Sequence, residues 1–235
     1  MDSAAVTSPT PVLIPGNMCD GRLWTDAVRE ALPGAVDADT TRDDTIDAMA
    51  ERALRQTNGA LQPVGFSMGG IVALAMARIA PERIVSMVLL DTNPSADLAE
   101  RAAVRPAQQS AVRAGALERI VIDELKPNYL AAANRGDCAL RELLKDMALD
   151  LGPDVFIAQS EALRVRPDQR DVLPSLDVPM LIACGAEDRL CPPAWHVRMA
   201  AGAARATLHI VEGAGHMLPL EQPTRLAALI ADWRG

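Results

Sequence analysis

Aromatic side chains are scarce in this chain of 235 residues, which has three Trp, two Phe and one Tyr. This scarcity excludes base stacking and aromatic cages as its main means of recognition. Basic residues are also in deficit, since 23 Lys and Arg stand against 31 Asp and Glu and leave a net charge of -8. A chain of this charge attracts phosphate backbones and anionic lipid only weakly. We therefore expect neither nucleic acid nor a membrane as its partner.

Long apolar runs and paired cysteines are absent as well, and we expect no secretory leader. No stretch reaches the roughly 18 apolar residues that a membrane span needs. The N-terminal stretch has no basic residue before an apolar run and no cleavage site after one, which predicts a cytoplasmic protein. The four cysteines, Cys19, Cys138, Cys184 and Cys191, form no C-x-x-C pair. We therefore expect no metal site and no disulfide framework.

Short apolar runs alternate with helical patterns in the first half of the chain, as in a mostly parallel sheet flanked by helices. Strands are predicted at 12–14, 61–66, 84–90, 180–184 and 207–211, and helices after Thr45, at 68–80 and at 224–233. From about 95 to 174 only helical patterns occur, with Asp137 as an N-cap and Gly152 as a helix stop. The prediction is an α/β core of residues 1–94 and 175–235 with an all-helical cap inserted at 95–174.

One short motif lies between a predicted strand and a predicted helix. Residues 65–69 read Gly-Phe-Ser-Met-Gly, which is the Gly-x-Ser-x-Gly pattern of a sharp turn that presents a serine at the end of a strand. The two glycines are explained by the lack of space two residues either side of the serine. An ordinary serine in a glycine-rich turn is the alternative, and the flanking elements argue against it. Ser67 is the candidate nucleophile.

A serine nucleophile needs a neighbouring base, and the chain has three histidines. His209 lies in an apolar run, where a buried or edge-strand histidine is the simpler interpretation, and His196 lies in a helical stretch beside Trp195. His216 follows the last predicted strand in a glycine-rich loop that is able to aim an imidazole over the sheet edge. His216 is therefore the candidate base.

Three carboxylates compete for the role of orienting that base. Asp188 and its neighbour Glu187 follow the strand at 180–184, and Asp91 ends an earlier strand. Asp188 is favoured, because serine, acid and histidine then fall on three strand ends in the chain order Ser, Asp, His. A solvated loop carboxylate is the alternative for each of the three.

Backbone N–H groups are expected to stabilise the charge that forms on an attacked carbonyl. The turn places the N–H of Met68 there, and the loop after the first strand offers Asn17 as the first choice for a second donor and Met18 as the second. Met18 and Met217 adjoin these elements and are candidates for substrate binding, with core packing an equal alternative. An arginine of the 164–170 stretch is a weaker candidate for binding a substrate carboxylate, because solvated surface charge is the commoner role.

Taken together, these motifs resemble the α/β-hydrolase superfamily. The resemblance rests on Pro15-Gly16, the Ser67 turn, the Leu89-Leu90-Asp91 strand end, Cys184 to Asp188, and Gly213 to Pro223. It implies a triad of Ser67, Asp188 and His216, no cofactor, and a cap inserted after Asp91. The chain departs from the superfamily in having Pro15-Gly16 where members commonly have His-Gly, and in a shortened stretch at 37–44.

The function expected from these residues is hydrolysis of a small carboxylic ester, thioester or lactone through an acyl-enzyme. Two alternatives stay open. The same triad would serve a carbon–carbon bond hydrolase or a lyase, and a silent scaffold would serve as a binding protein or receptor. The sequence does not distinguish acyl length or oligomeric state.

Overall fold

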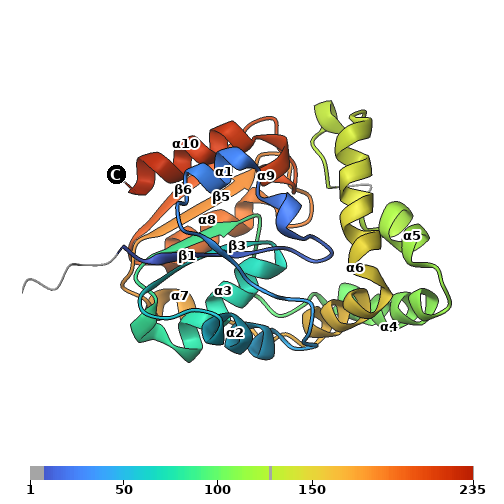
Figure 1. The fold of residues 1–235 in the computed structure, drawn as a ribbon, viewed down its shortest axis with the longest axis horizontal. Helices are drawn as coiled ribbons and strands as arrows, with labels where there is room; N and C mark the ends of the chain where they lie inside the picture. Colours follow the sequence, from blue (N-terminus) through green and yellow to red (C-terminus); the bar gives the residue numbers. More distant parts are fainter. Residues whose placement is uncertain (1–7, 127–128, 235) are drawn as a thin grey trace, which may run out of the picture.

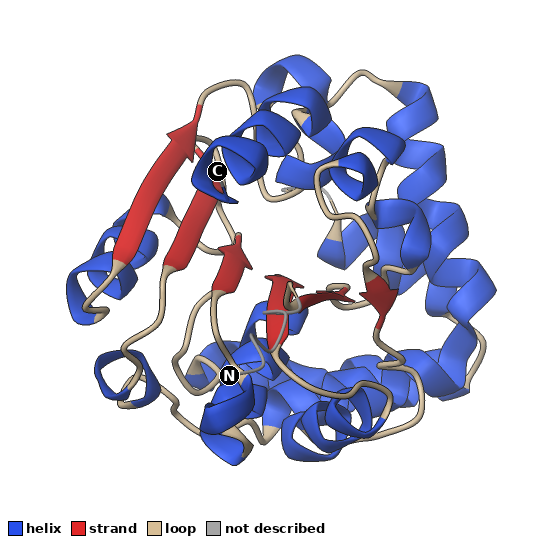
Figure 2. Cartoon of the chain, turned by 60° about the vertical axis from the view of Figure 1, so that its left-hand side comes forward, coloured by secondary structure: helices blue, strands red, loops and turns tan. Residues whose placement is uncertain are grey.

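The computed structural model describes residues 8–126 and 129–234. The N-terminal stretch that was examined for a secretory leader lies largely outside these residues. In the described part, six strands form one parallel sheet in the order β2-β1-β3-β4-β5-β6 (Figures 1 and 2). The strands are β1 (Thr10–Ile14), β2 (Val36–Asp37), β3 (Leu61–Phe66), β4 (Met87–Leu90), β5 (Met180–Gly185) and β6 (Ala206–Val211). The predicted α/β class is confirmed.

Four of the strands are buried because their sequences are nearly continuous apolar runs, as parallel strands covered on both faces require. The short strand β2 pairs with β1 through Val36 and Asp37, and its two exposed residues carry no strand pattern. It was not predicted. The strand predicted from Ile84 is shorter than expected, because Ile84 makes only an isolated bridge to Leu61 before β4 begins.

Helices cover both faces of the sheet (Figure 1). One face carries α2 (Ile46–Arg55), α3 (Met68–Ile79), α7 (Val172–Ser175) and α8 (Pro193–Gly202), and the other carries α1 (Asp26–Glu30) and α10 (Pro223–Arg234). Short turns of helix complete the core at η1 (Gly21–Leu23), η2 (Pro81–Arg83) and α9 (Leu218–Glu221). The predicted start of α2 is confirmed, because the Thr45 hydroxyl accepts a hydrogen bond from the N–H of Ala48.

After β4, the regular elements from Ala99 to Arg164 in the described part of the chain are helices that lie to one side of the sheet (Figure 1). The elements are α4 (Ala99–Arg113), α5 (Leu117–Arg119), η3 (Ile120–Leu125), η4 (Ala132–Asn134) and α6 (Cys138–Arg164). Asp137 caps α6 as predicted, through the N–H of Leu140. Gly152, at φ 83°, bends α6 between two helical halves. Gly152 therefore ends the first helical half, as predicted, and Pro153 starts the second.

Among the helices of the described ranges, none has an apolar stretch of membrane-spanning length.

Candidate active site

The carboxyl ends of parallel strands meet at one edge of a sheet, and the predicted serine, acid and histidine follow β3, β5 and β6 at that edge. The structure brings all three side chains together. His216 Nε2 lies 2.9 Å from Ser67 Oγ, and His216 Nδ1 lies 2.9 Å from Asp188 Oδ2. Both distances are those of hydrogen bonds, and the second holds the imidazole in one orientation.

The turn at Ser67 is strained, with φ 52° and ψ −114°. A Cβ atom at Gly65 would collide with the backbone of Gly69, and one at Gly69 would collide with the carbonyl of Ile14. The steric explanation of the two glycines is therefore correct. The Ser67 N–H donates to the Leu90 carbonyl at 2.9 Å, which anchors the turn to the neighbouring strand.

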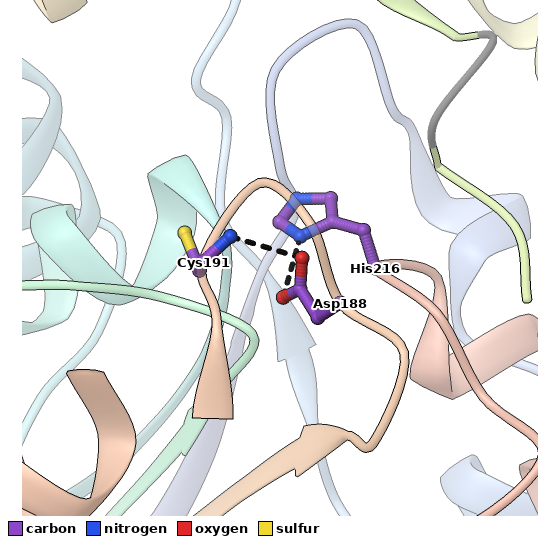
Figure 3. A group of neighbouring side chains, drawn as sticks. All are labelled: Asp188, Cys191 and His216. Carbon is purple, nitrogen blue, oxygen red and sulfur yellow. Dashed lines mark hydrogen bonds and ion pairs between the residues drawn. The ribbon is translucent and has the colours of Figure 1, made fainter. Parts of the chain in front are cut away.

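Asp188 is buried and meets three donors, of which Figure 3 shows Cys191 and His216. Its Oδ1 accepts the N–H groups of Leu190 and Cys191 at 2.8 and 2.9 Å, and its Oδ2 faces the imidazole. Burial opposes ionisation of this carboxyl, but the charge and hydrogen bond of His216 and the two N–H groups outweigh it, so the pKa of Asp188 is lowered. Asp188 is thus an ionised partner for the histidine.

The two rival carboxylates are occupied elsewhere. Glu187 accepts the N–H of Ala132 at 2.9 Å, in the helical segment. Asp91 is buried and accepts the N–H of Gly185 at 2.9 Å. Burial and the nearby charge of Asp188 raise the pKa of Asp91 well above its ordinary value, so it is not a second anion at the histidine.

Neither of the other two histidines lies in this hydrogen-bonded group. His196 is fully buried in α8, and its Nε2 accepts the N–H of Thr92 at 3.0 Å. Burial lowers its pKa to about 4. His209 is half-buried on the edge strand β6, as its apolar surroundings in the sequence indicated.

A cysteine thiol also lies beside the acid and the base (Figure 3). Cys191, Asp188 and His216 place their potential ligand atoms within 4.8 Å of one another. Burial raises the pKa of the Cys191 thiol to about 12, so the thiolate that a metal prefers is disfavoured. The imidazole and carboxylate are already joined to each other, and the donor set fits proton transfer better than metal binding.

The candidate oxyanion donors are the N–H groups of Met68 and Asn17. In residues 8–126 and 129–234, neither N–H donates to a protein acceptor. Both residues line the cavity that contains Ser67. The second-choice donor, Met18, is already engaged, because its N–H donates to Gln159 Oε1 at 2.8 Å. Of the two candidates in this loop, Asn17 is therefore the one whose N–H has no protein acceptor among the described residues.

Gln159 is a site residue that sequence reasoning missed. It is fully buried on α6, and its Oε1 also accepts the Asn17 side-chain amide at 3.2 Å. Its Nε2 donates to the Thr40 carbonyl at 3.2 Å. It therefore ties the helical segment to the loop after β1. No local pattern signals this role, because the partners at Asn17 and Met18 are more than a hundred residues away.

Tyr129 and Glu221 are further neighbours of the histidine that were not singled out. The Tyr129 ring lies edge-on to the His216 imidazole, with 5.3 Å between ring centroids. The backbone N–H of His216 donates to the backbone carbonyl of Tyr129 at 2.6 Å. Glu221 accepts the N–H groups of Gly215 and Ala131 at 2.7 Å each. These contacts join the histidine loop to the helical segment.

The cavity at Ser67 has a volume of about 240 Å³ and is lined by both the core and the helical segment. Met18 and Met217, expected as substrate-binding residues, do not line it. Both are fully buried in apolar packing, which is the alternative that the sequence left open. Met68 is the methionine on the cavity wall. A larger hollow of about 660 Å³ lies between η3 and α6 and contains none of the three hydrogen-bonded residues.

Comparison with known proteins gives a consistent result. Residues 12–229 match the model of the alpha/beta hydrolase family. A pimeloyl-[acyl-carrier protein] methyl ester esterase of Neisseria meningitidis serogroup C is 26% identical over 86% of this chain and 80% of its own length. The esterase of the same name from Methylococcus capsulatus is 28% identical over 96% and 94%. The malate-bound structure of a thermophilic esterase from Thermogutta terrifontis superposes with a TM-score of 0.85 at 27% identity, covering 97% of this chain and 90% of that one.

Proposed function

Because this chain belongs to the alpha/beta hydrolase family, we propose that it hydrolyses a small carboxylic ester with Ser67 as nucleophile, His216 as base and Asp188 as orienting acid. It is an ester-acting hydrolase, and the relatives reported above are likewise named esterases. The observation that supports these residue roles is the pair of 2.9 Å hydrogen bonds that joins serine, imidazole and carboxylate at one sheet edge.

The geometry leads to a two-step reaction. Ser67 Oγ attacks the ester carbonyl while His216 Nε2 takes its proton, and Asp188 stabilises the imidazolium. The N–H groups of Met68 and Asn17 stabilise the oxyanion, a contribution worth about a hundredfold or more in rate for each donor. His216 then protonates the leaving alkoxide. Water, deprotonated by the same imidazole, cleaves the acyl-enzyme to release the acid and restore Ser67.

We further propose that residues 95–174 act as a cap over this site. The cavity wall combines core residues with residues of α4, η3 and α6. The hydrogen bonds of Gln159 and Glu221 seat the segment on both catalytic loops. A cap seated in this way sets the size of the acyl or alcohol group that reaches Ser67.

The test is labelling by a fluorophosphonate probe together with turnover of p-nitrophenyl esters, lactones and acyl thioesters. Ser67→Ala should abolish labelling and lower ester turnover on the order of 10⁴-fold or more. Ser110→Ala, an exposed serine on α4, is the matched control and should be labelled and turn over as the parent does. Unchanged turnover in Ser67→Ala would refute the assignment.

A further inference from the structure

Guanidinium groups gather on the wall of the Ser67 cavity. Arg101 and Arg105 reach it from α4, and Arg166 reaches it from the end of the helical segment. We call these three residues the arginine cluster. The cluster is positively charged, whereas the chain as a whole has a net charge of -8. The local excess of positive charge is therefore a property of this site.

Only part of that charge is neutralised by the protein. The buried carboxylate of Asp97 lies 2.7 Å from Arg105 Nε and 3.0 Å from Arg166 Nη1. The other carboxylate on the wall, Glu124, pairs with Arg119 at 2.8 Å. One buried carboxylate thus serves two guanidinium groups.

Arg101 is the member of the cluster that lacks a carboxylate partner. Its Nη2 donates to the Leu190 carbonyl at 3.1 Å, and among the described residues no carboxylate lies within ion-pair distance of it. Arg105 donates to Asp97 through Nε, and within the same residues no hydrogen bond from its two terminal nitrogens is found. These donors are the ones that bind a carboxylate in a planar, two-point geometry.

Partly buried cations are costly unless an anion accompanies them. We propose that the substrate supplies such an anion: it is a small ester bearing a free carboxylate held by Arg101 and Arg105 while Ser67 attacks its ester carbonyl. This inference rests on the proposed function. The cavity, at about 240 Å³, lies below the roughly 300–1,000 Å³ of pockets for drug-sized ligands, so the part of the substrate that enters it is small.

The test uses pairs of esters that differ in one charge. In the first pair, p-nitrophenyl hemiglutarate carries a carboxylate where p-nitrophenyl valerate ends in a methyl group. In the second, O-acetyl-lactate carries the carboxylate on the alcohol side and isopropyl acetate replaces it by a methyl group, with acetate release as the readout. After correction for hydroxide-catalysed rates, kcat/KM should favour the anionic member of at least one pair about tenfold or more.

The arginine variants locate the effect. Arg101→Gln should reduce the anionic-to-neutral ratio about tenfold, and Arg101→Lys should keep part of it because the charge remains. Arg113→Gln, an exposed arginine at the other end of α4, should leave the ratio unchanged. If Arg101→Gln does not fold, inhibition of the unmodified enzyme provides the test: glutarate should compete with p-nitrophenyl valerate, and valeramide should not.

The possible failures are distinguishable. Neutral esters hydrolysed with no anionic preference in either pair, or a preference that survives in Arg101→Gln, would overturn the carboxylate site and leave the hydrolase intact. No turnover of any ester and no fluorophosphonate labelling of Ser67 would overturn the proposed function, and the carboxylate site with it.

Discussion

Gln159 connects the helical segment to the loop proposed to supply an oxyanion donor, and its replacement by Leu should impair both stability and rate. The change removes the acceptor of the buried Met18 N–H and of the Asn17 amide, and the donor to the Thr40 carbonyl. A buried donor left without a partner costs about 1–3 kcal/mol, so the free energy of unfolding should fall by about 2 kcal/mol or more. A loop that releases Asn17 weakens one oxyanion donor, which predicts a loss in kcat of about tenfold to a hundredfold.

Steady-state kinetics and inhibitor binding distinguish a role of Gln159 in positioning the loop after β1 from a role in packing alone. For Gln159→Leu, kcat on a p-nitrophenyl ester should fall while KM changes little. Affinity for a trifluoromethyl ketone should fall by a similar factor, because the oxyanion of its serine adduct is bound by the same N–H donors. Gln159→Glu keeps the acceptor for Met18 and loses the donor to Thr40, so it should retain more of kcat than the leucine variant.

A second buried glutamine provides the control. Gln109 lies on α4 and donates to the hydroxyl of Ser160, the chain neighbour of Gln159, at 3.3 Å. Among the described residues it makes no hydrogen bond to the loop after β1. Gln109→Leu should lower stability and leave kcat unchanged. If Gln159→Leu lowers stability in the same way and kcat stays at the parent value, Gln159 only packs the helical segment and the positioning argument is wrong.

Two buried titratable groups near the proposed triad, His196 and Asp91, predict opposite pH effects on stability, measurable by urea unfolding between pH 4 and 8. Burial lowers the pKa of His196 to about 4, so its neutral form stabilises the fold above its ordinary pKa near 6.5. As the pH falls from 8 to 4, the free energy of unfolding should lose about 3 kcal/mol of this contribution. The His196→Gln variant should not show that pH-dependent loss. Asp91, whose pKa is raised, contributes stability below pH 4 that is lost as the pH rises, so Asp91→Asn should gain on the parent with increasing pH. If the difference in unfolding free energy between a variant and the parent does not change with pH, the pKa shift assigned to that variant's residue is wrong.

Much of the core was predictable because its signals are local. The apolar runs of β3 and β5 and the capping hydroxyl of Thr45 act within a few residues, so their outcome depends little on distant parts of the chain. The glycines around Ser67 likewise report a steric demand that is met within one turn. Strand β2 escaped prediction because its two residues are exposed and only pairing with β1 makes them a strand.

The residues proposed for catalysis were found for a different reason. Ser67, Asp188 and His216 each follow a strand, and parallel strands deliver their ends to one edge. Residue type and position after a strand selected the serine and the histidine, and the chain order Ser, Asp, His favoured Asp188 over its rivals. The methionines had no such constraint. Whether Met18 and Met217 line the cavity or pack beneath the loops depends on side-chain direction, which sequence spacing does not specify.

Local sequence is enough to specify the parallel sheet, the strained serine turn and the identity of the residues at the strand ends, because each follows from the properties of a short segment. The tertiary fold settles which loop N–H remains available, since Gln159 reaches Met18 across 141 positions, and which arginines line the cavity at Ser67. Contacts of that length depend on how a helical segment sits on a sheet. The placement of the helical segment on the sheet depends on many side-chain contacts between distant parts of the chain, so no single stretch of sequence predicts it.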